Sequence, residues 1–185
     1  FSALKEKIPF MRDSYGHSML SVLGTYADKL IVAPLFGFAF LGNYQLAFQI
    51  LMILTMISSI VFSYLLPQEA SGKPHRKLWL VIILIVLVSS ILTIVLAPSV
   101  LPILMPKYAP AIDLIQIMSI AAVSMTITLR YTSKFLGDEK SKIVIFGKIT
   151  YLTSHIIGIF SIGTEFGIQG VAVSFVIASS LEALY

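Results

Sequence analysis

Long stretches of this chain carry only apolar and uncharged residues. Residues 30–68 contain no Asp, Glu, Lys or Arg, and residues 78–106 form a second such stretch. A membrane-spanning helix needs about 20 mainly apolar residues. The first stretch therefore accommodates parts of two spans, with a break at Gly42-Asn43, which is a turn signal. This pattern predicts spans over 18–41 and 44–66, and a third span that ends near Ala97.

The rest of the pattern predicts three more spans, over 111–135, 143–162 and 168–185. The five residues Gly163 to Gly167 are interpreted as a turn between the last two. Before the fourth span, prolines at 98, 102, 106 and 110 are too close together for a regular helix, so we expect a broken segment at the membrane surface. The expected fold class is an all-α integral membrane protein, with six transmembrane helices forming one bundle over residues 18–185.

Lysine and arginine are unevenly distributed between the predicted loops. Ten of them lie in the N-terminal segment, the second-to-third loop and the fourth-to-fifth loop, whereas the opposite side carries only Lys107. The positive-inside rule then places both ends of this segment on the cytoplasmic side of the cell membrane. Residues 1–17 mix apolar and basic positions at helical spacing. They indicate either an interfacial linker helix, which Pro9 bends or ends, or a flexible basic tail.

Composition narrows the function classes. The chain is 57% hydrophobic and 12% charged, with a mean hydropathy of +0.94, whereas globular domains are about 25% charged. A soluble fold and a basic nucleic-acid module are thereby excluded. The sequence has no cysteine, no Gly-rich phosphate loop, no His/Asp/Glu ligand cluster and no serine with a plausible base. We therefore expect no enzyme, metal site or cofactor. The chain begins at Phe1 without an initiator Met and is expected to be a piece of a longer protein.

Asp28 and Lys29 lie near the middle of the first predicted span. Charged groups at that depth usually face a bundle interior or a water-filled cavity. Adjacent helical positions point about 100° apart, so we expect each residue to have its own partner rather than to face the other. Pro34 deprives the Leu30 carbonyl of its helical donor and predicts a kink. A bent helix with intramembrane charge is typical of a transporter site. The alternatives are a structural ion pair with another helix, or Lys29 snorkelling outward.

Other polar residues in the spans are weaker candidates for a substrate or ion pathway. Gln45 and Gln49 lie one turn apart and either contact sugar hydroxyls or bond a neighbouring helix. Lys148 has Tyr151 on the same helix face and either meets a phosphate or snorkels. His155 either titrates or forms a helix–helix hydrogen bond. Asp113 and Glu182 lie near span ends and are interpreted as solvated, whereas Arg130 at the cytoplasmic end of the fourth span is explained by the positive-inside rule.

Several stretches in this order resemble the polysaccharide flippases of the multidrug/oligosaccharidyl-lipid/polysaccharide superfamily. The resemblance covers nearly the whole chain. Its motifs are Ala27-Asp28-Lys29, Leu41-Gly42-Asn43-Tyr44, Pro67 at the end of the second span, Lys107-Tyr108-Ala109-Pro110-Ala111-Ile112 leading into Leu114-Ile115-Gln116-Ile117, Leu136-Gly137-Asp138-Glu139-Lys140, and Phe166-Gly167-Ile168-Gln169-Gly170-Val171-Ala172.

The resemblance implies a two-bundle transporter, of which this chain is similar to the second, C-terminal six-helix lobe, with residues 1–17 as the cytoplasmic interfacial linker. It implies translocation of a polyprenyl-diphosphate-linked oligosaccharide across the cytoplasmic membrane for surface polysaccharide synthesis. The implied partners are that glycolipid, membrane lipids, a coupling Na⁺ or H⁺ and the missing N-terminal lobe. Lys29 would attract the diphosphate, and Asp28 would couple an ion or hold Lys29 in place.

Two alternatives stay open at the level of the sequence. In a cation-coupled multidrug exporter of the same superfamily, Asp28 would bind sodium or a proton, although the basic residues near the cavity ends argue against cationic drugs. In a non-transporting membrane scaffold, Asp28, Lys29 and Lys148 would be paired internally.

Overall fold

The computed structural model describes residues 2–69 and 76–184. The elements in chain order are α1 (Ser2–Phe36), α2 (Phe38–Glu69), α3 (Arg76–Leu104), η1 (Pro106–Ala111), α4 (Ile112–Gly137), α5 (Ser141–Gly158), η2 (Ile159–Gly163) and α6 (Thr164–Leu184). These described residues form helices and no strand. The structure thus confirms an all-helical fold.

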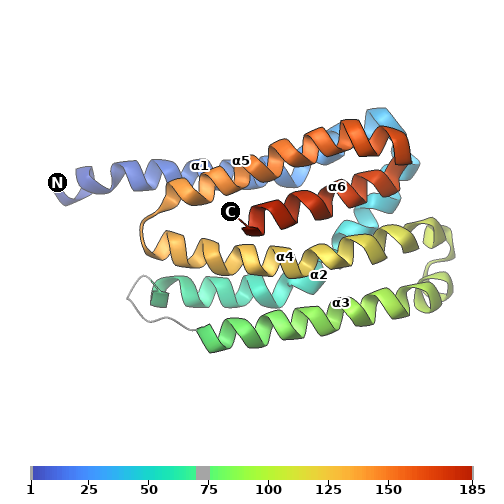
Figure 1. Ribbon diagram of the computed structural model, residues 1–185, viewed down its shortest axis with the longest axis horizontal. Helices are drawn as coiled ribbons and strands as arrows, with labels where there is room; N and C mark the ends of the chain where they lie inside the picture. Colours follow the sequence, from blue (N-terminus) through green and yellow to red (C-terminus); the bar gives the residue numbers. More distant parts are fainter. Residues whose placement is uncertain (1, 70–75, 185) are drawn as a thin grey trace.

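Five helical stretches are long and apolar enough to cross a membrane: Ser18–Phe36, Phe38–Gln68, Arg76–Leu104, Pro106–Gly137 and Ser141–Leu184. The last of them holds both α5 and α6, and the chain reverses between these two helices (Figure 1). Gly167 has a φ of +62° at this reversal, which only glycine adopts readily. The reversal agrees with the predicted turn between the last two spans.

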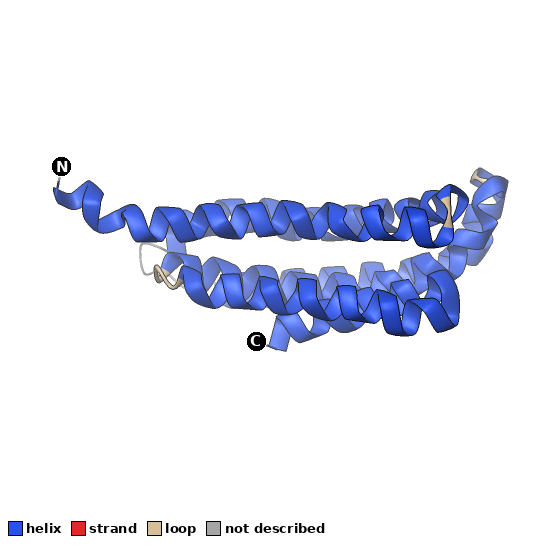
Figure 2. Ribbon diagram, turned by 90° about the horizontal axis from the view of Figure 1, so that it is seen from above, coloured by secondary structure: helices blue, strands red, loops and turns tan. Residues whose placement is uncertain are grey.

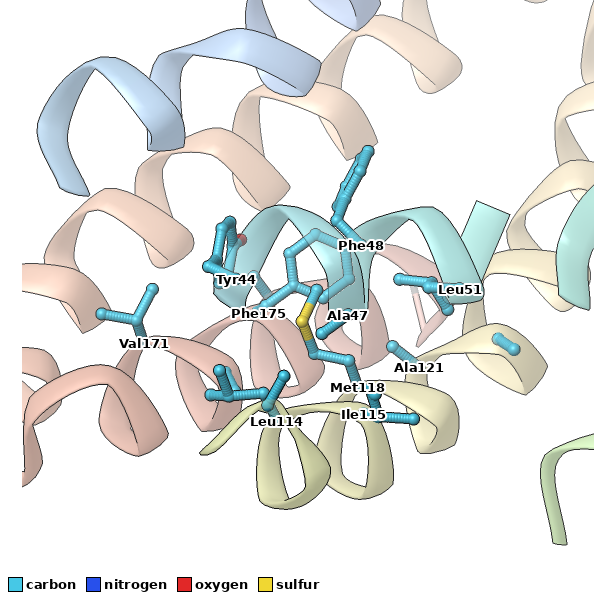
Figure 3. Close-up of a cluster of buried hydrophobic side chains, with 14 of the residues drawn as sticks. Tyr44, Ala47, Phe48, Leu51, Leu114, Ile115, Met118, Ala121, Val171 and Phe175 are labelled. Carbon is cyan, nitrogen blue, oxygen red and sulfur yellow. The ribbon is translucent and has the colours of Figure 1, made fainter. Parts of the chain in front are cut away.

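The helices share one long direction (Figure 2). Helix α4 packs against α2, α3 and α6, while α5 packs against α6 and α1 (Figure 1). The core lies where α2, α4 and α6 meet, and Figure 3 shows side chains from all three helices converging there. Its fully buried members include Tyr44, Leu51, Leu114, Met118 and Phe175.

Small and hydroxyl side chains allow these helices to approach closely, as is common where lipid gives no hydrophobic drive for association. Ser58 Oγ lies 2.9 Å from Thr126 Oγ1 and joins α2 to α4. At the contact of α5 with α6, a Cβ added to Gly158 would lie only 2.4 Å from Ser174 Cβ. A Cβ added to Gly170 would lie 2.2 Å from the Ile162 carbonyl oxygen. Larger residues at these two glycines would force the backbones apart.

The predicted break at Gly42-Asn43 is wrong. Helix α1 ends at Phe36, Gly37 has a φ of +88°, and Gly42 lies inside α2. The chain reverses between α1 and α2 through one glycine with a left-handed backbone, and this glycine is Gly37 rather than Gly42. At the other end of α1, the helix begins at Ser2 and runs through Pro9, so this proline does not end it.

The expected break over the four prolines is only partly correct. Pro98 and Pro102 lie inside α3, and the chain leaves the helix at Met105 before η1 takes up Pro106 and Pro110. A proline removes the donor for the carbonyl four residues earlier, which for Pro98 is that of Ile94. Gln116 Nε2 of α4 donates to this carbonyl oxygen at 2.8 Å. A neighbouring helix thus supplies the missing hydrogen bond, which is how membrane helices tolerate proline.

Candidate functional site

Asp28 is buried within α1, with only 2% of its surface exposed. Its Oδ2 accepts a hydrogen bond from the Tyr44 hydroxyl of α2 at 2.7 Å, and its Oδ1 accepts one from the Lys29 backbone N–H at 2.7 Å. A carboxylate without such donors would be very costly in an apolar interior. Tyr44, which is itself 0% exposed, is therefore part of the site, and the sequence interpretation did not identify it.

Lys29 folds back along α1 instead of pointing away from its neighbour. Its Nζ lies 3.6 Å from Asp28 Oδ1 and donates a hydrogen bond to the Thr25 carbonyl oxygen. The same Nζ lies 3.9 Å from the centre of the Phe48 ring, a cation–π distance. The expectation that Asp28 and Lys29 do not face each other is wrong, because the long lysine stem bends across the angle between adjacent helical positions.

A second ion pair joins α5 to α6. Lys148 Nζ lies 3.3 Å from Glu182 Oε1 and 4.6 Å from the centre of the Tyr151 ring. The side chains of Lys148 and Glu182 are only 19% and 11% exposed. The interpretation of Glu182 as a solvated residue at a span end is therefore wrong. Tyr151 is buried, so the predicted pairing of Lys148 with Tyr151 on one helix face is present.

A small open cleft lies beside the second ion pair. It is lined by the Lys148–Glu182 pair and Tyr151, and by Phe48, whose ring also carries the Lys29 ammonium. Gly24 and Thr25 supply the α1 side of the cleft. The structure thus brings α1, α2, α4, α5 and α6 together around one cleft, which Lys148 lines and which Lys29 approaches through the Phe48 ring.

The remaining candidates lie outside this cleft. Gln45 is half-buried, and its Oε1 has no hydrogen-bond partner among the described residues. Gln49 is exposed one turn later, and neither glutamine lines the cleft. Pro34 lies in the last turn of α1, two residues before the helix ends at Phe36. Among the residues predicted from the sequence, the charged ones therefore lie at or near the cleft, whereas the two glutamines lie away from it.

No group of three or more His, Cys, Asp or Glu side chains among the described residues is arranged to hold a metal ion. Comparisons with protein-family models, with curated proteins and with solved structures find no match to this chain. The functional argument therefore depends on the site itself.

Proposed function

We propose that this chain is one lobe of a membrane transporter that moves a polyprenyl-diphosphate-linked oligosaccharide from the cytoplasmic to the outer leaflet of the cell membrane. In this proposal the chain crosses the membrane six times with both ends of the segment in the cytoplasm. It works together with a second six-helix lobe and with a coupling Na⁺ or H⁺.

The observation that carries the proposal is the cleft lined by Lys148, with Lys29 against the Phe48 ring that also lines it. Ammonium groups among apolar spans are costly and usually serve a function. A diphosphate needs cationic partners and a path with water. Lys29 is held against Asp28 and the Phe48 ring, and Lys148 is held against Glu182, so both cations stay near the cleft without a bound anion. A diphosphate that entered the cleft would compete with these carboxylates for the two ammonium groups.

A non-transporting scaffold is the second candidate, and the internal pairing favours it. Asp28 pairs with Lys29, and Lys148 pairs with Glu182, so each buried charge has a counter-charge within the chain. Helices joined only for structural support would have the same pairs.

Access of water to the cleft separates the two functions. The chain contains no cysteine, so a single introduced thiol reports on its own site. Thr25 lines the cleft, whereas Ser58 is buried between α2 and α4 and provides the matched control. If the transporter proposal is correct, a membrane-impermeant maleimide labels Thr25→Cys and leaves Ser58→Cys unlabelled. Complete protection of both thiols would support the scaffold.

Transport itself is tested with the full-length protein purified from its own membranes. Native mass spectrometry first identifies the co-purifying glycolipid, which is then reconstituted with the protein in vesicles. We expect Lys29→Ala and Asp28→Asn to reduce the flipping rate at least about tenfold, the loss that corresponds to about 1.4 kcal/mol. Lys107→Ala, at the exposed start of η1, is the control. Unchanged flipping in both site variants would refute the assignment of the site.

A further inference from the structure

His155 is a buried polar residue that the proposed function does not use. It lies on α5 with 3% of its surface exposed. Its ring packs against Tyr151 at 5.7 Å and edge-on against Phe175 at 5.4 Å, measured between ring centres. Its Nε2 has no hydrogen-bond partner among the described residues. The sequence allowed a helix–helix hydrogen bond here, and no such bond is found at Nε2. A buried imidazole nitrogen without a partner calls for an explanation, and proton binding is a role that histidine commonly has.

The helix packing places His155 at the level of Asp28. Helices α1 and α5 lie side by side and run in the same direction (Figure 1). Gly24 of α1 packs on Tyr151 of α5, since a Cβ at Gly24 would lie 3.4 Å from Tyr151 Cε1. Asp28 follows Gly24 on α1 by four positions, about one helical turn, and His155 follows Tyr151 on α5 by the same interval. Because both helices rise about 1.5 Å per residue, the two side chains keep this level.

The other ionisable groups around α5 are engaged elsewhere. On α5 itself and on α6, Lys148 and Glu182 pair with each other, and Lys148 lies two turns before His155. On α2, the Tyr44 hydroxyl donates its hydrogen bond to Asp28. On α4, Tyr131 lies near the start of α5, where it lines a small cleft with Val144 and Gly147. Asp28 is therefore the carboxylate available to balance a positive imidazole.

We propose that His155 binds a proton within the bundle, that Asp28 is the counter-charge of the resulting imidazolium, and that protonation releases the Lys29 ammonium into the cleft. Asp28 is now shared between the Tyr44 hydroxyl and Lys29. Lys29 is the member of this group that can leave, because its side chain is 16% exposed and flexible, whereas that of Asp28 is 1% exposed. A proton on His155 thus converts a paired lysine into a free cation beside the cleft, for any anion that enters it. This proton site is independent of which molecule is transported, or whether any is.

Histidine NMR on the intact protein in lipid nanodiscs tests the proton site without any transported ligand. The sequence has three histidines, so His155→Gln assigns the signal, and His17 and His75 are internal references. We expect the His155 signal to titrate between pH 8 and 3. In Asp28→Asn the midpoint falls by about one pH unit or more, because the imidazolium loses its counter-charge. In Lys29→Met the midpoint rises, because a repelling charge is gone. Asp113→Asn, at the far end of α4, is the matched control and leaves the midpoint in place.

The release of Lys29 has its own readout. In protein with ¹⁵N-labelled lysine side chains, the Lys29 signal, assigned with Lys29→Met, is expected to shift with the same midpoint as His155 and to stay constant in His155→Gln. A His155 signal that does not titrate in this range, or a midpoint that Asp28→Asn leaves unchanged, would overturn the proton site. A Lys29 signal that ignores the His155 transition would overturn the release. Neither result depends on flipping, so a protein that fails to flip glycolipid can still pass this test.

Discussion

The contact of α5 with α6 at Gly158 gives the sharpest test of the packing. The change is Gly158→Ala, whose Cβ would lie 2.4 Å from Ser174 Cβ. Carbon atoms pack at about 3.5 Å or more, so the helices must separate by about 1 Å. Both atoms are fixed to backbone, and no rotamer change relieves the overlap. Overpacking of this kind costs about 1–3 kcal/mol, and we expect a value at the upper end.

A compensating change makes this prediction specific. In Ser174→Gly the overlapping Cβ is gone, and the nearest remaining atom to the new alanine is the Cα of residue 174 at 3.4 Å, an ordinary contact. Ser174→Gly alone costs about 1 kcal/mol, since glycine disfavours a helix. In the double variant we expect the glycine to recover about 2 kcal/mol of the alanine's cost, seen as a coupling energy in the double-mutant cycle.

The measurement is the free energy of unfolding in mixed micelles titrated with SDS, followed by the fluorescence of Trp79, the single tryptophan of the chain. Gly42→Ala is the control, because it lies inside α2 and its added Cβ meets nothing within 4 Å. We expect it to be neutral or to stabilise by up to about 1 kcal/mol. If Gly158→Ala behaves like Gly42→Ala, or if the costs of the two substitutions simply add, the close packing of α5 on α6 is refuted.

Three further predictions use the same unfolding assay. Tyr44→Phe removes the hydroxyl that donates to Asp28 and should cost about 1–3 kcal/mol, the penalty of a buried acceptor left without its partner; a cost below about 0.5 kcal/mol would mean that Asp28 does not need this bond. Lys148→Met should destabilise by about 3 kcal/mol because Glu182 stays buried and unpaired, and Lys148→Met with Glu182→Leu should be markedly more stable than the single variant; equal stability would contradict a buried pair. Gly167→Ala should cost about 1–3 kcal/mol because its φ of +62° and ψ of −144° strain any residue with a Cβ, and an unaffected variant would show that the reversal before α6 does not need this conformation.

Apolar patterning predicts where this chain forms membrane-length helices but not where each helix ends. Gly37 and Gly42 both follow apolar stretches, and Gly42 has the better turn neighbour in Asn43. Only the structure shows that Gly37 takes the positive φ. For Pro98, the decisive partner is Gln116, eighteen positions later and on another helix. Rules based on neighbouring residues cannot predict such a bond, so they placed the end of this helix too early in the sequence.

The candidate site was predictable only in part, because some of its residues matter only through contacts between helices. Asp28, Lys29 and Lys148 attract attention in any apolar span because of their charge alone. Tyr44 and Glu182 do not, since a tyrosine in a span is common and a glutamate near a span end is normally hydrated. Their importance arises from tertiary contacts, with Tyr44 against Asp28 and Glu182 against Lys148. The signal that could have identified Tyr44 is the need of a buried carboxylate for a donor on the next helix.

The packing of α1 on α5 has a consequence for how the protein is made. Gly24 and Tyr151, which touch across these helices, lie 127 positions apart in the sequence. At about 5–20 residues per second, a ribosome needs roughly 6 to 25 s to synthesise the chain between them. Tyr44 follows Asp28 by only 16 positions, an interval of roughly 1 to 3 s at the same speed. The tyrosine hydroxyl and the neighbouring lysine can thus shelter the carboxylate in the nascent α1–α2 pair until α5 is inserted. A variant without the Tyr44 hydroxyl would then reach the finished bundle in lower yield than the wild-type chain.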